Sequence, residues 1–252
     1  SVVIAQYYGA QNDKKIHQAV HTSYILAIVS GILMMLFGLF FSYQCLDAIG
    51  TPHDILNDAT LYMQLYFLCM IPGAIYNIGA GILRAVGDSK RPLYYLIVCS
   101  IVNVVFDFIF VVIFHQGIAG AAIATVIAQF VCAVLVTIQL MRTKEVYKLT
   151  LSKMKFHLPV LKKIIMIGAP AGIQSTMYSI SNIVLQSHIN AFGTQTIASW
   201  SVYVKIDALF WMMIAAIGAA ITTFSGQNYG AHLHDRIKKG TRTALTMAFI
   251  MT

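Results

Sequence analysis

Three side chains that carry oxygen atoms are spaced so that they could bind a small cation in an apolar part of the chain. Asp107 lies in the middle of the apolar stretch Leu93 to Phe114, and Asn103 lies one helical turn before it on the same helix face. Thr125, in the next apolar stretch, adds a hydroxyl oxygen. An ionised carboxylate inside a membrane costs about 3 kcal/mol or more unless it has a partner. These oxygens therefore suit a hard cation, or a proton on Asp107 whose hydrogen bond the amide accepts.

The same three residues also have a purely structural interpretation. Asn and Thr often form hydrogen bonds that merely hold two membrane helices together, although Asp does so less often. We expect a cation site with Asp107 as its charged ligand and Asn103 and Thr125 beside it. The residue types do not separate H⁺ from Na⁺. We predict no catalytic residue, no metal centre and no organic cofactor, because no pairing of His with Glu or of Cys with His suits such chemistry.

Lys205 and Asp207 are two further charged residues inside an apolar stretch, which runs from Ile197 to Ser225. Because they are two positions apart, they point to nearly opposite sides of a helix and are poor partners for each other. Each is expected to face protein or a wet cavity on a substrate path. The alternative is an ion pair with another helix.

A polar stripe runs along the apolar stretch Ile164 to Ile189 at spacings of four, three and four residues. Its members are Ser175, Ser179, Asn182 and Gln186. The stripe could line a substrate path. Its small side chains could instead let two helices pack closely.

Composition indicates that lipid, rather than water, surrounds most of the elements that hold these residues. Hydrophobic residues make up 58% of the 252 residues and charged residues 10%, with a mean hydropathy of +0.75, whereas an ordinary soluble domain has about 25% charged residues. A membrane-spanning helix needs about 20 predominantly apolar residues. The predicted spans are His21 to Leu46, Ala59 to Leu83, Leu93 to Phe114, Ala119 to Met141, Ile164 to Ile189 and Ile197 to Ser225, with pieces of two more at Ser1 to Ala5 and Thr241 to Thr252.

Positive charge is confined to alternate connections between the spans. Of 17 Lys and Arg residues, only Lys205 lies outside four segments. Those segments are Lys14 to Lys15, Arg84 to Arg91, Arg142 to Lys163 and Arg236 to Arg242; the intervening loops Asp47 to Asp58, His115 to Ile118 and Ala191 to Thr196 hold neither residue type. Because Lys and Arg concentrate on the cytoplasmic side, the basic segments are predicted to be cytoplasmic. This topology, with anionic lipid, explains the net charge of +8, so we expect no nucleic-acid partner.

A short motif near the start of the chain returns near its end. Gln6-Tyr7-Tyr8-Gly9-Ala10 matches Gln227-Asn228-Tyr229-Gly230-Ala231, 221 residues later, and each copy ends an apolar run and precedes a basic stretch. The match continues beyond the motif, since Ile16 pairs with Ile237 at the same offset. This pattern predicts a membrane protein of two similar halves, of which the chain holds one repeat period and an overlap.

Cysteine and proline predict local features of the spans. Cys45, Cys69, Cys99 and Cys132 lie singly in four different spans and are expected to pack as small apolar side chains. Pro72 and Pro170 are expected to interrupt their spans, either as fixed kinks or as moving hinges, because proline removes a helical hydrogen bond. Pro159 could open a short helix on the membrane surface within the basic segment Arg142 to Lys163.

In four motifs, one of them repeated, the chain resembles the multidrug and toxic compound extrusion (MATE) family. The residues that carry the resemblance are the repeated Gln-x-Tyr-Gly-Ala, Ile82 to Pro92 (ILRAVGDSKRP), Gly117 to Thr125 (GIAGAAIAT) and Gly168 to Gly172 (GAPAG). The resemblance covers the whole chain and implies an all-α integral membrane fold, part of a twelve-helix transporter with two six-helix lobes. The chain would run from the end of helix 2 to the start of helix 9.

The resemblance implies a domain division and a site. Residues 1–141 would form an N-terminal lobe without helix 1 and most of helix 2, 142–163 a cytoplasmic linker, and 164–252 the first part of the C-terminal lobe. In the prokaryotic branch that includes the DNA-damage-inducible protein F subgroup, the cation site uses an Asn, an Asp and a Thr that match Asn103, Asp107 and Thr125, together with an Asp on helix 1. A second branch has a Glu where this chain has Tyr178.

The function implied is multidrug efflux, in which H⁺ or Na⁺ is exchanged for organic, mostly cationic, compounds across the cytoplasmic membrane of a bacterium or archaeon by alternating access. The expected partners are small organic substrates, the lipid bilayer and the missing helices of the same protein. An alternative is a flippase for lipid-linked oligosaccharides in the same superfamily, in which Lys205 would contact an anionic headgroup. A membrane receptor or a membrane-embedded enzyme is a further alternative, although receptors lack this internal repeat.

Overall fold

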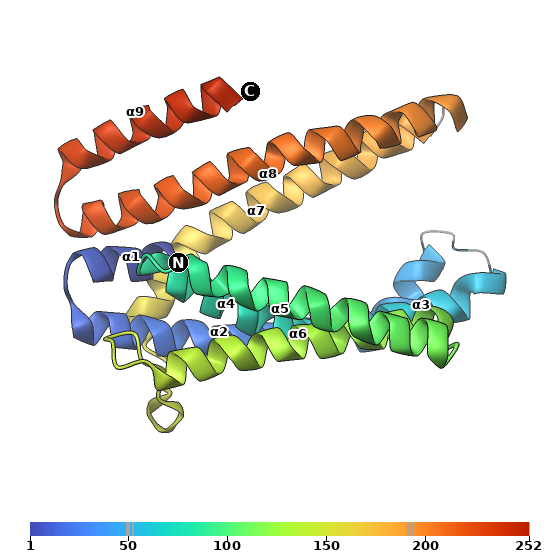
Figure 1. Ribbon diagram of the computed structural model, residues 1–252, viewed down its shortest axis with the longest axis horizontal. Helices are drawn as coiled ribbons and strands as arrows, with labels where there is room; N and C mark the ends of the chain where they lie inside the picture. The colour runs from blue at the N-terminus through green and yellow to red at the C-terminus, as the bar shows by residue number, and fades with distance from the viewer. Residues whose placement is uncertain (49–50, 52, 191, 193, 252) are drawn as a thin grey trace. The chain divides into compact units, whose positions relative to one another are not determined.

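The apolar stretches form long helices in the computed structural model, which describes residues 1–48, 51, 53–190, 192 and 194–251 (Figure 1). The described part contains helices, turns and loops but no strand, as an all-α membrane protein requires. The elements are α1 (Val2–Gly9), α2 (Asp13–Ala48), α3 (His53–Phe67), α4 (Met70–Ala85), α5 (Lys90–Asp107), the π-helix η1 (Phe108–Ile113), α6 (Gly117–Arg142), the 3-10 helix η2 (Leu151–Lys153), α7 (Leu158–Asn190), α8 (Thr194–Gly230) and α9 (His234–Met251).

Five helical segments in the described residues are long and apolar enough to cross a membrane. They are Asp13–Ala48, Ile55–Ala85, Lys90–Ile113, Gly117–Arg142 and Ser199–Gly230. Helix α7 covers the remaining predicted span and has 33 residues, but it is not among the five. Its polar stripe and its glycines lower its hydropathy, so length alone supports the prediction of a span there.

The chain forms two compact units, which are described separately. The first contains Ser1 and Asp13–His157. Within it α2 packs on α4, α4 on α6, and α5 on α6. The basic residues Arg84, Lys90 and Arg142 lie near helix ends at one end of this unit, whereas the turn between α5 and α6 lies at the other end (Figure 1). The helices of this unit therefore separate the basic from the neutral connections as the charge pattern predicts.

The segment that joins α6 to α7 is packed against the first unit. The side chains of Tyr147 and Leu149 are buried. The buried ring of His21 on α2 accepts a hydrogen bond from the backbone N–H of Thr150 at 3.1 Å, and the Thr22 hydroxyl accepts one from the N–H of His157 at 3.3 Å. The basic linker therefore holds a defined course across the end of α2.

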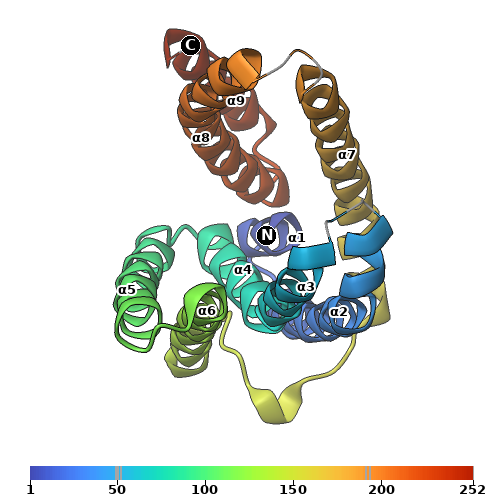
Figure 2. The ribbon, with the colours of Figure 1, turned by 90° about the vertical axis from the view of Figure 1, so that its right-hand side faces the viewer.

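The second unit contains Val2–Asn12 and Leu158–Thr252, and its helices are α1, α7, α8 and α9. Helices α8 and α9 are neighbours, joined by a short turn (Figures 1 and 2). Helix α1 packs on α8, and the Lys163 ammonium lies 4.8 Å from the centre of the Tyr7 ring. The first copy of the repeated motif thus belongs to the same compact unit as the second. The predicted division at 141 and 163 stays a prediction.

The two copies of the motif fold into the same turn. Three backbone hydrogen bonds close each copy at matching positions. They are Ala10 N–H to Gln6 O, Gln11 N–H to Tyr8 O and Asn12 N–H to Tyr7 O in the first, and Ala231 N–H to Gln227 O, His232 N–H to Tyr229 O and Leu233 N–H to Asn228 O in the second. Gln11 and His232 both have positive φ angles, of 50° and 60°. The repeat in sequence is therefore a repeat in backbone structure.

The motif glycines let α1 and α8 approach closely and reciprocally. A methyl group added at Gly9 would overlap the carbonyl oxygen of Gln227, and one added at Gly230 would overlap the carbonyl oxygen of Gln6. These two contacts exchange under the 221-residue offset. Such an exchange is the mark of a local two-fold relation between the motif copies.

Pro72 and Pro170 differ in their effect on the helices. Helix α3 ends at Phe67 and α4 begins at Met70. Pro72 therefore lies in the first turn of α4, where a missing N–H costs little. Pro170 lies inside α7, which continues through it as one helix from Leu158 to Asn190. Pro170 therefore does not end its helix, because loss of one backbone bond did not stop the turns on either side. The expected kink or hinge at Pro170 stays a prediction. Pro159 is the second residue of that same helix, not the start of a separate one.

Gly87 ends α4 in a way that no other residue type does well. Its φ angle is +95°, and the N–H groups of Gly87 and Asp88 donate to the carbonyls of Arg84 and Leu83 at 3.0 and 2.9 Å. This is a Schellman cap. The Asp88 carboxylate then binds the backbone N–H and the side chain of Arg91, both at 3.2 Å, at the start of α5.

We expect Gly87→Ala to lower the stability of the full-length protein by about 1 to 2 kcal/mol, because an L-residue is strained at positive φ. Thermal unfolding in detergent measures the effect. Gly168→Ala is the matched control, because its added methyl group meets no atom of the described residues within 4 Å. An unchanged unfolding temperature for Gly87→Ala would contradict the prediction.

Candidate functional site

The candidate cation site lies between α5 and α6, which pack side by side (Figure 1). Asn103 lies in the last turns of α5, and Asp107 is the last residue of that helix. Thr125 lies on the facing helix α6, two turns after its start. All three side chains are half-buried. The structure therefore brings the Asn and the Thr from separate helices to one place, with the Asp one turn away.

A hydrogen-bond chain links the two helices at this point. The Asn103 side-chain amide donates to the Thr125 hydroxyl at 3.5 Å, and that hydroxyl donates to the carbonyl of Ala121 at 3.0 Å. The first contact is at the limit of hydrogen-bond length and is weak. It uses the amide nitrogen of Asn103, so the amide oxygen remains as an acceptor.

Asp107 differs from its neighbours because one of its oxygens lacks a partner. The Oδ1 atom is buried and makes no hydrogen bond within the described part of the chain. Burying a polar atom without a partner costs about 1 to 3 kcal/mol, so such atoms are rare and usually mark a ligand, a proton or a strained site. A carboxylate oxygen in this state, one helical turn from the Asn103 amide, can bind a proton or a hard cation.

One structural feature at Asp107 could not be read from the residue types. The chain changes from α-helix to π-helix immediately after it, over Phe108–Ile113. π-helices hold well under 1% of residues in proteins and are frequent at functional sites. Gly120, within the Gly117 to Thr125 segment, packs against this π-helix, but a glycine in the neighbouring helix does not indicate a π-helix in a sequence.

The cysteines of α5 and α6 are paired. Cys99 and Cys132 form a disulfide with a Cα to Cα distance of 5.8 Å, within the usual range. The expectation that all four cysteines pack singly is therefore wrong for these two, because neighbouring helices bring together residues 33 positions apart. Cys45 and Cys69 are free. Cys99 lies one turn before Asn103 on α5, so the disulfide fastens the helix pair that carries the site.

We expect peptide mass spectrometry of the alkylated, denatured protein to find the Cys99 and Cys132 peptides cross-linked before reduction and separate after it. Cys45 and Cys69 should be alkylated in both samples, because they are free. A Cys99→Ser variant is the control, since it leaves Cys132 open to alkylation without reductant. Alkylation of both residues in the unreduced wild-type protein would contradict the pairing.

Lys205 and Asp207 both lie on α8. Lys205 is exposed and Asp207 is half-buried. No ion pair joins either of them to another residue of the described part. Their predicted role on a substrate path stays a prediction, as does the alternative of an ion pair with another helix.

The polar stripe lies on the exposed surface of α7. The hydroxyl of Ser175 donates to the Ala171 carbonyl and that of Ser179 to the Ser175 carbonyl, both at 3.0 Å within the same helix. Asn182 and Gln186 continue the stripe toward the end of the helix. Tyr178, where a Glu would mark the second branch, contacts the Trp211 ring edge-on at 6.1 Å between centroids. That contact is apolar, so this position supplies no charged ligand.

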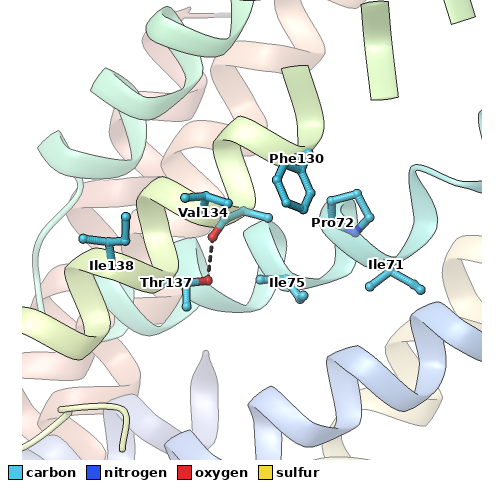
Figure 3. Close-up of a pocket in the computed structure, with 8 residues that line it drawn as sticks. Ile71, Pro72, Ile75, Phe130, Val134, Thr137 and Ile138 are labelled. Atoms are coloured by element: carbon cyan, nitrogen blue, oxygen red, sulfur yellow. Dashed lines mark hydrogen bonds between the residues drawn. The ribbon is translucent and has the colours of Figure 1, made fainter. Parts of the chain in front are cut away.

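An apolar cavity of about 210 Å³ lies between α4 and α6 at Pro72 (Figure 3). Its lining has one polar side chain, Thr137, whose hydroxyl donates to the Ala133 carbonyl at 2.5 Å. The lining has no charged group, so this cavity offers nothing to hold a cation. Asp107 therefore remains the better candidate for a cation site.

Known proteins share the sequence pattern and the helical fold of this chain. The sequence model of the MatE family matches residues 1–109 and 170–252. The chain is 27% identical to the probable multidrug resistance protein YoeA of Bacillus subtilis (strain 168), over 100% of this chain and 56% of that protein. It is 20% identical to the multidrug export protein MepA of Staphylococcus saprophyticus, over 90% of this chain and 50% of that protein.

A solved structure points the same way. The crystal structure of MATE in the bent conformation superposes with a TM-score of 0.92 at 25% identity, over 99% of this chain and 56% of that chain. The chain spans about half the length of the relatives it matches. The family match includes the repeated motif and Asp107, and the structural match includes nearly every residue. The chain therefore belongs to the MatE family, and the relatives that it matches are named as multidrug resistance and multidrug export proteins, not as enzymes.

Proposed function

We propose that the full-length protein exports organic, mostly cationic, compounds in exchange for H⁺ or Na⁺, and that Asp107 binds the coupling ion. The observation that carries the proposal is the buried Oδ1 atom of Asp107, which lacks a hydrogen-bond partner in the described chain. Relatives named as multidrug export and multidrug resistance proteins support the substrate class.

The ion would act by changing the relative energies of two conformations. A proton or Na⁺ that enters from outside neutralises the Asp107 carboxylate and removes its cost of burial. The ion-bound and ion-free proteins then favour different arrangements, because a ligand shifts an equilibrium by its difference in affinity for the two states. Substrate is released outward in one arrangement, and release of the ion inward resets the other. We place the protein in the cytoplasmic membrane of a bacterium or archaeon.

The test is efflux of a cationic dye from vesicles that contain the full-length protein. A pH gradient, a Na⁺ gradient or neither is imposed, at zero membrane potential. We expect one gradient to drive efflux against the dye concentration, which also identifies the ion. Equal efflux with and without gradients would contradict ion exchange, and transport of an anionic lipid-linked sugar instead of the dye would favour the flippase alternative.

A further inference from the structure

The π-helix that follows Asp107 breaks the register of the α5 span. Its bonds join each N–H to the carbonyl five residues earlier, as Phe114 N–H does to Ile109 O at 2.9 Å. One extra residue per turn rotates the outer part of the span relative to the face that carries Asn103 and Asp107. The side chain of Asp107 therefore stands where the two helix geometries meet.

Close packing on α6 holds the π-helix in place. A methyl group added at Gly120 would lie 2.9 Å from the Cβ of Phe110, 3.0 Å from the Cβ of Gln116 and 3.1 Å from the carbonyl carbon of Phe110. Two of these atoms belong to η1, and one of them is backbone. The Gln116 N–H also donates to the Phe110 carbonyl at 2.9 Å. A larger residue at 120 therefore requires a shift of a few tenths of an ångström at this contact, which the backbone and Cβ of Phe110 can take up only if the π-helix moves with them.

Movement of the π-helix would reach Asp107 by two routes. Asp107 is joined to Phe108 covalently. The Phe110 ring also stacks on the Phe106 ring at 5.7 Å between centroids, and Phe106 directly precedes Asp107. Because Asp107 Oδ1 is held by no hydrogen bond in the described chain, the position of the backbone at Asp107 is what places the carboxylate.

We propose that the π-helix Phe108–Ile113, seated on Gly120, is the positioning element of Asp107 and sets the affinity of the site for its coupling cation. Gly120 and Phe110 are positioning residues and do not touch the ion. This inference rests on the proposed role of Asp107. It predicts that the ion dependence of transport responds to residue 120, although that residue carries no ligand.

The test uses Gly120→Ala in the full-length protein, in the dye efflux assay with the ion concentration varied. We expect the ion concentration for half-maximal efflux to rise about tenfold, as when groups behind a metal ligand are changed. The maximal rate should change less. Gly168→Ala is the control and should match wild type, because no atom in the part of the chain that the structure describes lies within 4 Å of its added methyl group. If Gly120→Ala leaves the ion concentration for half-maximal efflux unchanged and lowers only the maximal rate, Gly120 has a structural role alone and the proposal is overturned.

A second variant tests the proposal in case Gly120→Ala folds poorly. Deletion of Val111 removes one residue from η1 and favours an ordinary α-helix. We expect ion-induced thermal stabilisation of the purified protein to weaken in this variant; stabilisation equal to that of wild type would overturn the proposal. The two hypotheses fail separately. If Asp107→Asn keeps the ion dependence of wild type, the ion site is refuted. If Asp107→Asn loses that dependence while Gly120→Ala and the Val111 deletion keep it, only the positioning role is refuted.

Discussion

Asp107→Asn in the full-length protein is expected to abolish the ion-driven part of efflux while the protein still inserts. Asparagine keeps the size of the side chain and removes its charge and its ability to take up a proton. If the ion is H⁺, the variant has no group that can bind it. If the ion is Na⁺, its affinity should fall by about 10- to 100-fold, because interactions with a charged group are worth about 1.5 to 3 kcal/mol, which leaves the site empty at the Na⁺ concentrations that drive the wild-type protein. Efflux is measured in vesicles under separate pH and Na⁺ gradients.

Asp58→Asn is the matched control for this variant. Asp58 is an exposed residue of α3, so the same chemical change there should leave efflux intact. Asn103→Ala should have a smaller effect than Asp107→Asn, because it removes a neutral ligand and a weak bond to Thr125. Ion-driven efflux at the wild-type level in Asp107→Asn would reduce Asp107 to a packing role and direct attention to the second half of the protein.

The second large effect is expected at the glycines of the repeated motif. Gly9→Ala and Gly230→Ala each place a methyl group on a backbone carbonyl of the other helix. Backbone cannot turn aside as a flexible side chain can, so α1 and α8 must separate. Overpacking of this kind costs about 1 to 3 kcal/mol or more. Thermal unfolding of the full-length protein in detergent measures this cost. Gly172→Ala is the control, because its methyl group has no neighbour within 4 Å among the described residues.

The double variant tests the reciprocal geometry. Once α1 and α8 have moved apart for the first methyl group, the second should cost less. The loss of stability in the Gly9→Ala and Gly230→Ala double variant should therefore be smaller than the sum of the two single losses, as for residues that share a contact. Strict additivity would show that the two glycines act at independent places.

Much of the fold follows from local pattern. The long helices in the described chain follow the apolar stretches, and the basic residues of the first unit gather at one end as their spacing predicts. The motif copies share their turns because the same residue types meet the same backbone requirement. Asn103 and Thr125 approach each other as expected, since both lie on the faces that two neighbouring antiparallel helices present. These features depend on periods of a few residues and on short connections.

The amino-acid sequence by itself determined the helical membrane fold and the repeat, because composition, charge and helical spacing are local properties. It also predicts the trio Asn103, Asp107 and Thr125 as an ion site. Tertiary structure decided the rest. It decided that Cys99 pairs with Cys132, that α7 continues through Pro170, and that a π-helix seated on Gly120 follows Asp107. Each of these features depends on which helices are neighbours and on how each helix is rotated about its own axis. Distances between helices are set by packing over the whole unit, and no window of sequence contains them.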